Sequence, residues 1–131
     1  MARILVVDDD PDVLALVSFR IRKAGHKVIA VSGGQEALET VAARGAPDLA
    51  VLDVTMPDLD GLTLLQRLRA HAGLEALPAI FLSARVQPED IEAGRALGAT
   101  YLTKPFVATA LLNAINASLE ESSAAPTDGG W

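Results

Sequence analysis

The chain has 131 residues, of which 17 are Asp or Glu and 11 are Lys or Arg, so its formal net charge is −6. This acidic balance argues against a nucleic-acid-binding surface, which needs clustered basic residues to displace phosphate counterions. The absence of cysteine excludes disulfides, thiolate metal sites and cysteine nucleophiles, and it favours a reducing cytoplasm.

The first apolar stretch, residues 4–7, is too short for the apolar region of a signal peptide. No apolar run approaches the roughly 18 residues that cross a bilayer. We therefore expect a cytoplasmic protein without membrane or direct nucleic-acid partners.

Taken in chain order, short apolar runs predict five strands, separated and followed by segments with helical spacing. The first four runs do not alternate with polar residues, so we expect these strands to be buried on both faces. The predicted strands are 4–7, 28–31, 49–52, 79–82 and the shorter 100–103. The helical stripes are Val13, Leu14, Val17 and Ile21; Ala37, Leu38, Val41 and Ala42; Leu64, Leu65 and Leu68; Ile91, Gly94 and Leu97; and Leu111, Leu112, Ile115 and Leu119.

Strict alternation of strands and helices predicts an α/β fold in which a five-stranded parallel sheet carries helices on both faces. The pair Asp10-Pro11 is typical of a helix start, with an N-cap followed by proline. Residues 121–131 show no periodicity and little apolar content. We expect one domain over residues 1–120 and a disordered tail over residues 121–131.

In an open parallel sheet, the functional crevice lies beyond the carboxyl ends of the strands. The residues that follow the predicted strands are therefore informative: Asp8 and Asp9, Asp53, Ser83 and Lys104.

Two further acids have local explanations: Asp10 is an expected N-cap, and Asp12 is a first-turn acid favoured by the helix dipole. The two histidines, His26 and His71, lie in no motif, and we expect both on the solvated surface.

Asp8, Asp9 and Asp53 would repel one another if they met while ionised, so together they need a cation. Oxygen ligands without histidine or cysteine favour a hard ion, most readily Mg²⁺. A structural cation site is the plainer alternative, but it would not need the ammonium of Lys104. An ammonium beside an acidic metal site indicates an anion such as a phosphoryl group, for which Ser83 adds a hydrogen-bond donor.

A carboxylate can accept a phosphoryl group covalently. Asp53 is the better candidate acceptor, because it is a single carboxylate at the centre of the sheet whereas Asp8 and Asp9 are adjacent to each other. The residues alone thus indicate a phosphoryl-transfer site.

Four segments in register resemble the receiver domain of two-component response regulators over residues 2–119. They are Val6-Val7-Asp8-Asp9-Asp10, the segment from Leu52 to Gly61, Leu82-Ser83-Ala84, and Tyr101-Leu102-Thr103-Lys104-Pro105-Phe106. The resemblance implies a flavodoxin-like, doubly wound (βα)₅ fold with strand order 2-1-3-4-5. This chain has Ser at position 83, where the family commonly has Thr.

The resemblance also implies roles for the site residues. Asp53 would be the phosphoacceptor and the phosphohistidine of a partner kinase the donor. Mg²⁺ would be bound by Asp9 directly, by Asp8 mainly through water, and by Asp53 and the backbone carbonyl of Thr55.

Lys104 would pair with the phosphoryl oxygens, and the Lys104-Pro105 peptide bond would be cis. Ser83 and Tyr101 would be the switch residues. They would alter the face formed by the fourth helix, the fifth strand and the fifth helix.

These features predict a phosphorylation-activated signalling switch rather than an enzyme, since it would catalyse only its own phosphorylation and dephosphorylation. Its partners would be a sensor histidine kinase or phosphotransfer protein, and an effector protein. The sequence leaves open whether phosphorylation also leads to a homodimer.

One alternative is a receiver-like binding module that never sees phosphate. A Mg²⁺-dependent phosphatase with an aspartyl-phosphate intermediate is a second, but Asp53-Val54-Thr55 lacks the second acid of the Asp-x-Asp motif. A flavin site is disfavoured, because the acidic loop after the first strand would repel phosphate.

Overall fold

In the computed structural model, the described residues are 2–71, 73–84, 88–104 and 106–122, with no side-chain description for 121 and 122. The strands are β1 (Arg3–Val7), β2 (Lys27–Val31), β3 (Leu49–Asp53), β4 (Ala79–Ser83) and β5 (Thr100–Thr103). The helices are α1 (Pro11–Lys23), α2 (Gly34–Arg44), α3 (Gly61–Arg69), α4 (Pro88–Ala96) and α5 (Ala108–Ser122). Each strand lies within one residue of its predicted position.

All strand pairs are parallel, and the sheet has the order β2-β1-β3-β4-β5. The expected α/β fold, its flavodoxin-like topology and its strand order are therefore confirmed. The order places β1 and β3 side by side at the centre, with Val7 opposite Leu52. This is the point where the strand order reverses, and where such sheets bind their ligands.

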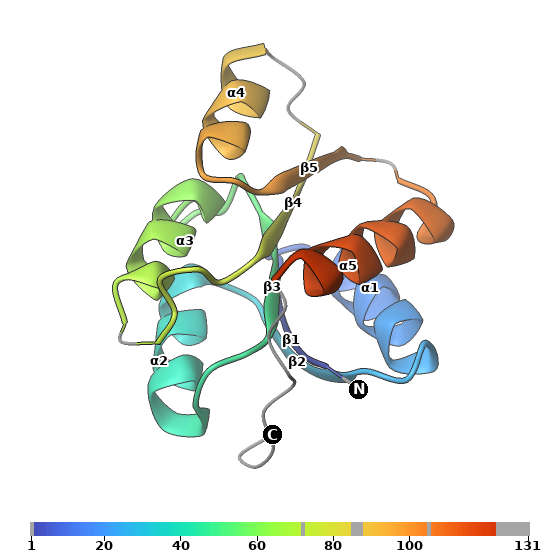
Figure 1. The fold of residues 1–131 in the computed structure, drawn as a ribbon, viewed down its shortest axis with the longest axis horizontal. Coiled ribbons are helices and arrows are strands. Elements are labelled where there is room, and N and C mark those ends of the chain that lie inside the picture. The colour runs from blue at the N-terminus through green and yellow to red at the C-terminus, as the bar shows by residue number, and fades with distance from the viewer. Residues whose placement is uncertain (1, 72, 85–87, 105, 123–131) are drawn as a thin grey trace.

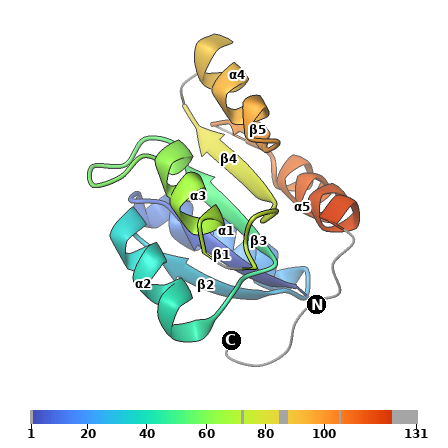
Figure 2. The same ribbon diagram turned by 60° about the vertical axis from the view of Figure 1, so that its left-hand side comes forward.

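The helices cover both faces of the sheet, with α1 and α5 on one face and α2 and α3 on the other (Figure 1). Figure 2 shows the same two layers from a second direction, with α4 beside β5. Alternate strand residues point to opposite faces, so the core is divided into two clusters. In β1, Leu5 joins the cluster with α2 and α3, and Ile4 joins the cluster with α1 and α5.

The edge strand β2 differs from one expectation. Both faces of β1, β3 and β4 are buried, as predicted. In β2, however, residues 28–30 are half-buried and only Val31 is fully buried, so the prediction of full burial was wrong for this strand. An edge strand has a neighbour on one side only, and sequence pattern does not reveal which strands are at the edges.

The start of α1 follows the predicted capping pattern. The Asp10 carboxylate accepts the backbone N–H groups of Asp12 and Val13 at 2.9 and 3.4 Å, and Pro11 opens the helix. At the other end, Gly25 has φ of +100°, a left-handed conformation that favours glycine. These two signals fix α1 between β1 and β2.

His26 differs from its predicted place on the solvated surface. It is half-buried, and its Nδ1 accepts the backbone N–H of Ala2 at 3.1 Å. Burial and the positive chain terminus lower the pKa of its imidazole. His71 is exposed, as predicted.

The last helix, α5, extends to Ser122, so the first two residues of the predicted tail are helical. Residues 123–131, the rest of that tail, lie outside the described residues. Across the described ranges, no helix combines the length and apolar character needed to cross a bilayer.

Candidate functional site

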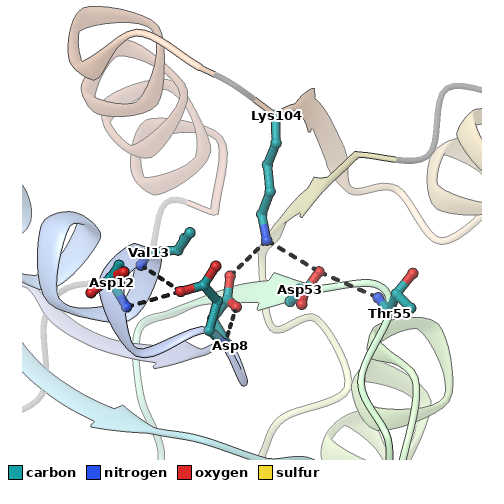
Figure 3. Close-up of polar contacts among 7 residues, drawn as sticks. Asp8, Asp12, Val13, Asp53, Thr55 and Lys104 are labelled. Atoms are coloured by element: carbon teal, nitrogen blue, oxygen red, sulfur yellow. Dashed lines mark hydrogen bonds and ion pairs between the residues drawn. The ribbon is translucent and has the colours of Figure 1, made fainter.

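The residues singled out by the sequence meet at the carboxyl ends of the strands. Asp8 follows β1, Asp53 ends β3, Ser83 ends β4 and Lys104 follows β5. Figure 3 shows Lys104 reaching from the end of β5 toward Asp8 and Asp53. Segments almost 100 residues apart in the chain thus form one site, because parallel strands end at the same edge of the sheet.

Three carboxylates form the acidic part of the site. Carboxylate oxygens of Asp8, Asp9 and Asp53 lie within 4.8 Å of one another. Asp8 and Asp53 are 2% and 5% exposed, whereas Asp9 is exposed to solvent. Burying like charges this closely is unfavourable, so the arrangement favours a bound cation.

Local backbone hydrogen bonds orient the two buried carboxylates. Asp8 Oδ1 accepts the N–H of Asp10 at 2.9 Å, so the loop after β1 folds around its own side chain. Asp53 Oδ1 accepts the N–H of Thr55 at 3.3 Å, which turns the chain after β3 in the same way. Short aspartate side chains favour such turns because they reach the amide two residues on.

Lys104 bridges the buried carboxylates. Its Nζ lies 2.9 Å from Asp8 Oδ2 and 3.5 Å from Asp53 Oδ1. Burial alone would lower the pKa of the Lys104 ammonium, but its hydrogen bond to Asp8 and the charge of Asp53 outweigh burial and raise that pKa. The side chain therefore stays charged beside the acids. Its backbone N–H donates to the carbonyl of Ser83 at 2.8 Å, which ties the end of β5 to β4.

The electrostatic environment makes Asp53 unusual among the acids. Burial, and then the negative charge of Asp8, raise the pKa of Asp53 from 3.8 to about 6, although Lys104 acts in the opposite direction. A carboxyl with this pKa is mostly ionised at neutral pH but remains close to protonation. Perturbed carboxyls in a polar crevice are typical of functional sites.

The donor set fits Mg²⁺. The carboxylate oxygens that could hold a metal ion come from Asp8, Asp9 and Asp53, and the hard cations Mg²⁺ and Ca²⁺ prefer carboxylate, carbonyl and water oxygens. Thr55, whose backbone carbonyl is the expected fourth protein ligand, lies next to this cluster through its N–H bond to Asp53.

The two expected switch residues lie at different depths. Ser83 is buried at the end of β4, at the edge that carries the carboxylates. Tyr101 is half-buried in β5, and its ring centroid lies 6.2 Å from that of Phe81. A Cβ added to Gly94 of α4 would lie 3.0 Å from the Tyr101 ring, so α4 packs closely over it.

Apolar surface adjoins the polar site. A cavity of about 390 Å³ lies beside Lys104 between α1 and the start of the β5–α5 connection, and Leu16 on its wall is 50% exposed. A larger groove of about 750 Å³ runs along α1 toward β2 and contains none of the predicted site residues. An exposed apolar side chain thus lies close to the lysine of the polar site.

Two features of the loop after β3 were not found from the sequence. A Cβ at Gly61 would overlap the backbone carbonyl of Asp53, so glycine lets α3 start against the site. Asp58 accepts the N–H groups of Gly34 and Gln35 at the start of α2. The N-cap of α2 is Gly33, which has no side chain. A glycine at the N-cap position indicates that the cap of α2 must come from elsewhere in the chain. It does not indicate which residue supplies that cap.

The predicted cis Lys104-Pro105 peptide bond involves Pro105, which lies outside the described residues. The same holds for residues 85–87, which follow Ser83 and Ala84.

Comparisons with known proteins agree with this arrangement. Residues 4–116 match the family model described as "Response regulator receiver domain". The transcriptional regulatory protein PrrA of Mycobacterium tuberculosis is 41% identical over 126 residues, which cover 95% of this chain and 53% of PrrA. Protein PilH of Pseudomonas aeruginosa is 36% identical over 120 residues, which cover 91% of this chain and 98% of PilH.

Among solved structures, the chemotaxis protein CheY4 of Vibrio cholerae has a TM-score of 0.81 and 32% identity, covering 90% of this chain and 98% of CheY4. The chain therefore spans about half the length of the transcriptional regulators that it matches, and nearly the whole length of PilH and CheY4.

Proposed function

This chain belongs to the response regulator receiver domain family of two-component signalling, and on that premise we propose that it is a switch activated by phosphorylation of Asp53. The observation that carries the proposal is the position of Lys104 Nζ, 2.9 Å from Asp8 and 3.5 Å from Asp53. An ammonium in this place can neutralise an anion delivered to the acidic cluster. The expected phosphodonor is the phosphohistidine of a sensor kinase or phosphotransfer protein.

In the proposed transfer, an Asp53 oxygen forms a bond to phosphorus as the phosphorus–nitrogen bond of the donor histidine breaks. The released imidazole nitrogen takes a proton from water. Dephosphorylation is hydrolysis: a water oxygen bonds to phosphorus, the aspartyl phosphorus–oxygen bond breaks, and inorganic phosphate leaves. The chain acts on its own carboxylate in both steps, so it is a switch and not an enzyme with an external substrate.

The residues around Asp53 assist in distinct ways. Asp8, Asp9, Asp53 and the Thr55 backbone carbonyl would hold Mg²⁺, which when bound offsets the negative charge of the carboxylates and phosphoryl oxygens. Lys104 would exchange part of its ion pairing with Asp8 and Asp53 for the phosphoryl oxygens. Burial of Asp8 and Asp53 keeps these charge interactions strong, because little water screens them.

Ser83 and Tyr101 would couple phosphorylation of Asp53 to a change in the protein surface. We propose that the Ser83 hydroxyl moves toward the phosphoryl group and that the Tyr101 ring turns further inward, which alters the face of α4, β5 and α5. The close contact of Tyr101 with Phe81 and Gly94 supports this, because a ring packed on two elements cannot move without shifting one of them.

The altered face would bind an effector protein in the cytoplasm. PilH and CheY4 are nearly completely covered by this chain, whereas PrrA is covered over about half its length. A second copy of the chain is the other proposed occupant of this face after phosphorylation.

The deciding experiment is the intact mass of the protein after incubation with a small acyl phosphate, with and without Mg²⁺. We expect one base-labile phosphoryl adduct that requires both Mg²⁺ and Asp53. The matched control is Asp12→Asn, an exposed acid on α1 outside the cluster, which should be modified like the unaltered protein. An adduct that persists in Asp53→Asn would overturn the assignment of the acceptor. No adduct under any condition would favour the binding module that never sees phosphate.

A further inference from the structure

The loop between β3 and α3, residues 54–60, is attached to the start of α2 by one side chain. Asp58 Oδ1 accepts the N–H of Gly34 at 3.2 Å, and Asp58 Oδ2 accepts the N–H of Gln35 at 3.0 Å. These amides are among the first of α2, and a helix leaves such groups without partners of its own. The hydrogen bonds also lower the pKa of the Asp58 carboxyl, which keeps it ionised. Asp58 thus caps a helix more than 20 residues away in the chain.

Apolar packing reinforces the same attachment. A Cβ at Gly34 would lie 2.7 Å from the Cβ of Leu59, so the loop rests directly against the helix backbone. The two ends of the loop are joined by the Gly61 N–H, which donates to the Val54 carbonyl at 2.9 Å. The loop is therefore closed at its base by Val54 and Gly61, and held at its tip by Asp58 and Leu59.

We propose that Asp58 is a positioning residue for the Mg²⁺ site, acting through the loop that carries Thr55. This inference rests on the proposed function, in which the Thr55 backbone carbonyl is a metal ligand. A side-chain ligand can adjust by rotating, but a backbone carbonyl can move only with its loop. Thr55 itself is exposed, and its N–H donates to Asp53 Oδ1 at 3.3 Å. The attachment of the loop tip to α2 therefore adds a restraint on the Thr55 carbonyl beyond the one at the base of the loop.

A restraint on the position of a ligand should increase Mg²⁺ affinity, because Mg²⁺ demands nearly ideal octahedral geometry. Groups that orient metal ligands without touching the metal commonly change affinity on the order of 10–100-fold when they are removed. For Asp58→Ala we expect the Mg²⁺ dissociation constant to rise on the order of tenfold, at the lower end of that range. Asp58→Asn, which keeps one carbonyl oxygen but loses the charge, should lie between this variant and the unaltered protein.

Isothermal titration calorimetry with MgCl₂ on the metal-free protein measures this effect without any phosphodonor. The matched control is Asp60→Ala, because Asp60 lies in the same loop and caps α3 through the N–H of Thr63 at 2.7 Å. Both variants lose a helix cap, but of these two acids Asp58 is the one that is hydrogen-bonded to α2. An Asp60→Ala protein that loses as much Mg²⁺ affinity as Asp58→Ala would overturn the proposal.

A second variant separates positioning from helix stability. Gly33 has an extended backbone, with φ of −159°, so Gly33→Ser can cap α2 with its own hydroxyl once Asp58 is absent. In Asp58→Ala/Gly33→Ser we expect thermal stability to recover while Mg²⁺ affinity stays low. Recovery of both would mean that Asp58 is only a helix cap.

Mg²⁺ binding by the unaltered protein distinguishes a failure of the proposed function from a failure of the role proposed for Asp58. Absence of Mg²⁺ binding there would count against the proposed function itself. Normal Mg²⁺ binding in the unaltered protein, together with undiminished binding in Asp58→Ala, would count against the role of Asp58 alone.

Discussion

Lys104 and Asp8 are separated by 96 positions in the chain, yet their side chains form an ion pair with a distance of 2.9 Å between Nζ and Oδ2. Asp8 is 2% exposed and the Lys104 side chain is 20% exposed, so solvent screens the pair only weakly. The same ammonium lies 3.5 Å from Asp53, the proposed phosphoacceptor. Lys104 therefore links Asp53 to the rest of the acidic cluster.

Replacing Lys104 should change the titration of Asp53. In Lys104→Met, we expect the pKa of Asp53 to rise above its value of about 6, because the ammonium that lowers it is gone while burial and Asp8 still raise it. Carboxyl carbon chemical shifts, followed by NMR against pH in metal-free protein, measure this directly. Lys27→Met, an exposed lysine at the start of β2, is the control and should leave that pKa unchanged. An unaltered Asp53 titration in Lys104→Met would contradict the ion-pair geometry.

The stability of the metal-free protein should depend on the charge of Asp53. The pKa of Asp53 is about 6 in the folded state against 3.8 as its ordinary value, so the folded state holds this proton more tightly. The contribution of Asp53 is therefore most favourable below about pH 4 and is lost as the pH rises through about 6.

Asp53→Asn lacks this titration, and we expect it to be more stable than the unaltered protein at pH 7 by about 1–3 kcal/mol. Urea unfolding with a chelator present, followed by circular dichroism from pH 4 to 8, measures the difference. The difference should shrink toward acidic pH. A difference that stays constant with pH would mean that the Asp53 charge does not cause it.

Binding of Mg²⁺ should stabilise the fold by mass action. At a free Mg²⁺ concentration one hundred times the dissociation constant, we expect about 2.7 kcal/mol of added stability. Asp9→Asn should lose most of this effect with little change in metal-free stability, since Asp9 is exposed but belongs to the carboxylate cluster. Thermal unfolding across a Mg²⁺ series tests this, with Asp12→Asn as the exposed control outside the cluster. If Asp9→Asn keeps the whole Mg²⁺ effect, Asp9 is not a ligand.

Filling the space at Gly94 should displace the Tyr101 ring. A Cβ there would lie 3.0 Å from Tyr101 Cδ2 and 3.2 Å from Phe81 Cδ2, closer than most such contacts in proteins. In Gly94→Ala we expect Tyr101 to move away from Phe81, and overpacking to cost about 1–3 kcal/mol. Nuclear Overhauser effects between the two rings report the displacement. Undiminished ring-to-ring effects would show that α4 yields instead of Tyr101.

Much of the fold follows from local pattern. The strands appear within one residue of their predicted positions because short apolar runs between turn signals mark strands closely. Asp10 caps α1 as predicted, because the cap and the amides it serves are adjacent in the chain. The predictions were wrong where an environment is assembled from distant segments. His26 is half-buried against Ala2, and residues 28–30 of β2 are only half-buried because β2 lies at the edge of the sheet.

The sequence by itself determined the fold class, the strand order through its family resemblance, and the convergence of Asp8, Asp9, Asp53, Ser83 and Lys104 on one edge. It could do so because the alternation of strands and helices forces a parallel sheet, and parallel strands end on the same side. Only the tertiary structure decided which charges touch, how far burial raises the pKa of Asp53, and that Asp58 holds the loop after β3 against α2. These properties depend on distances between segments that are far apart in the chain and on the exclusion of water. Neither is encoded in the order of neighbouring residues.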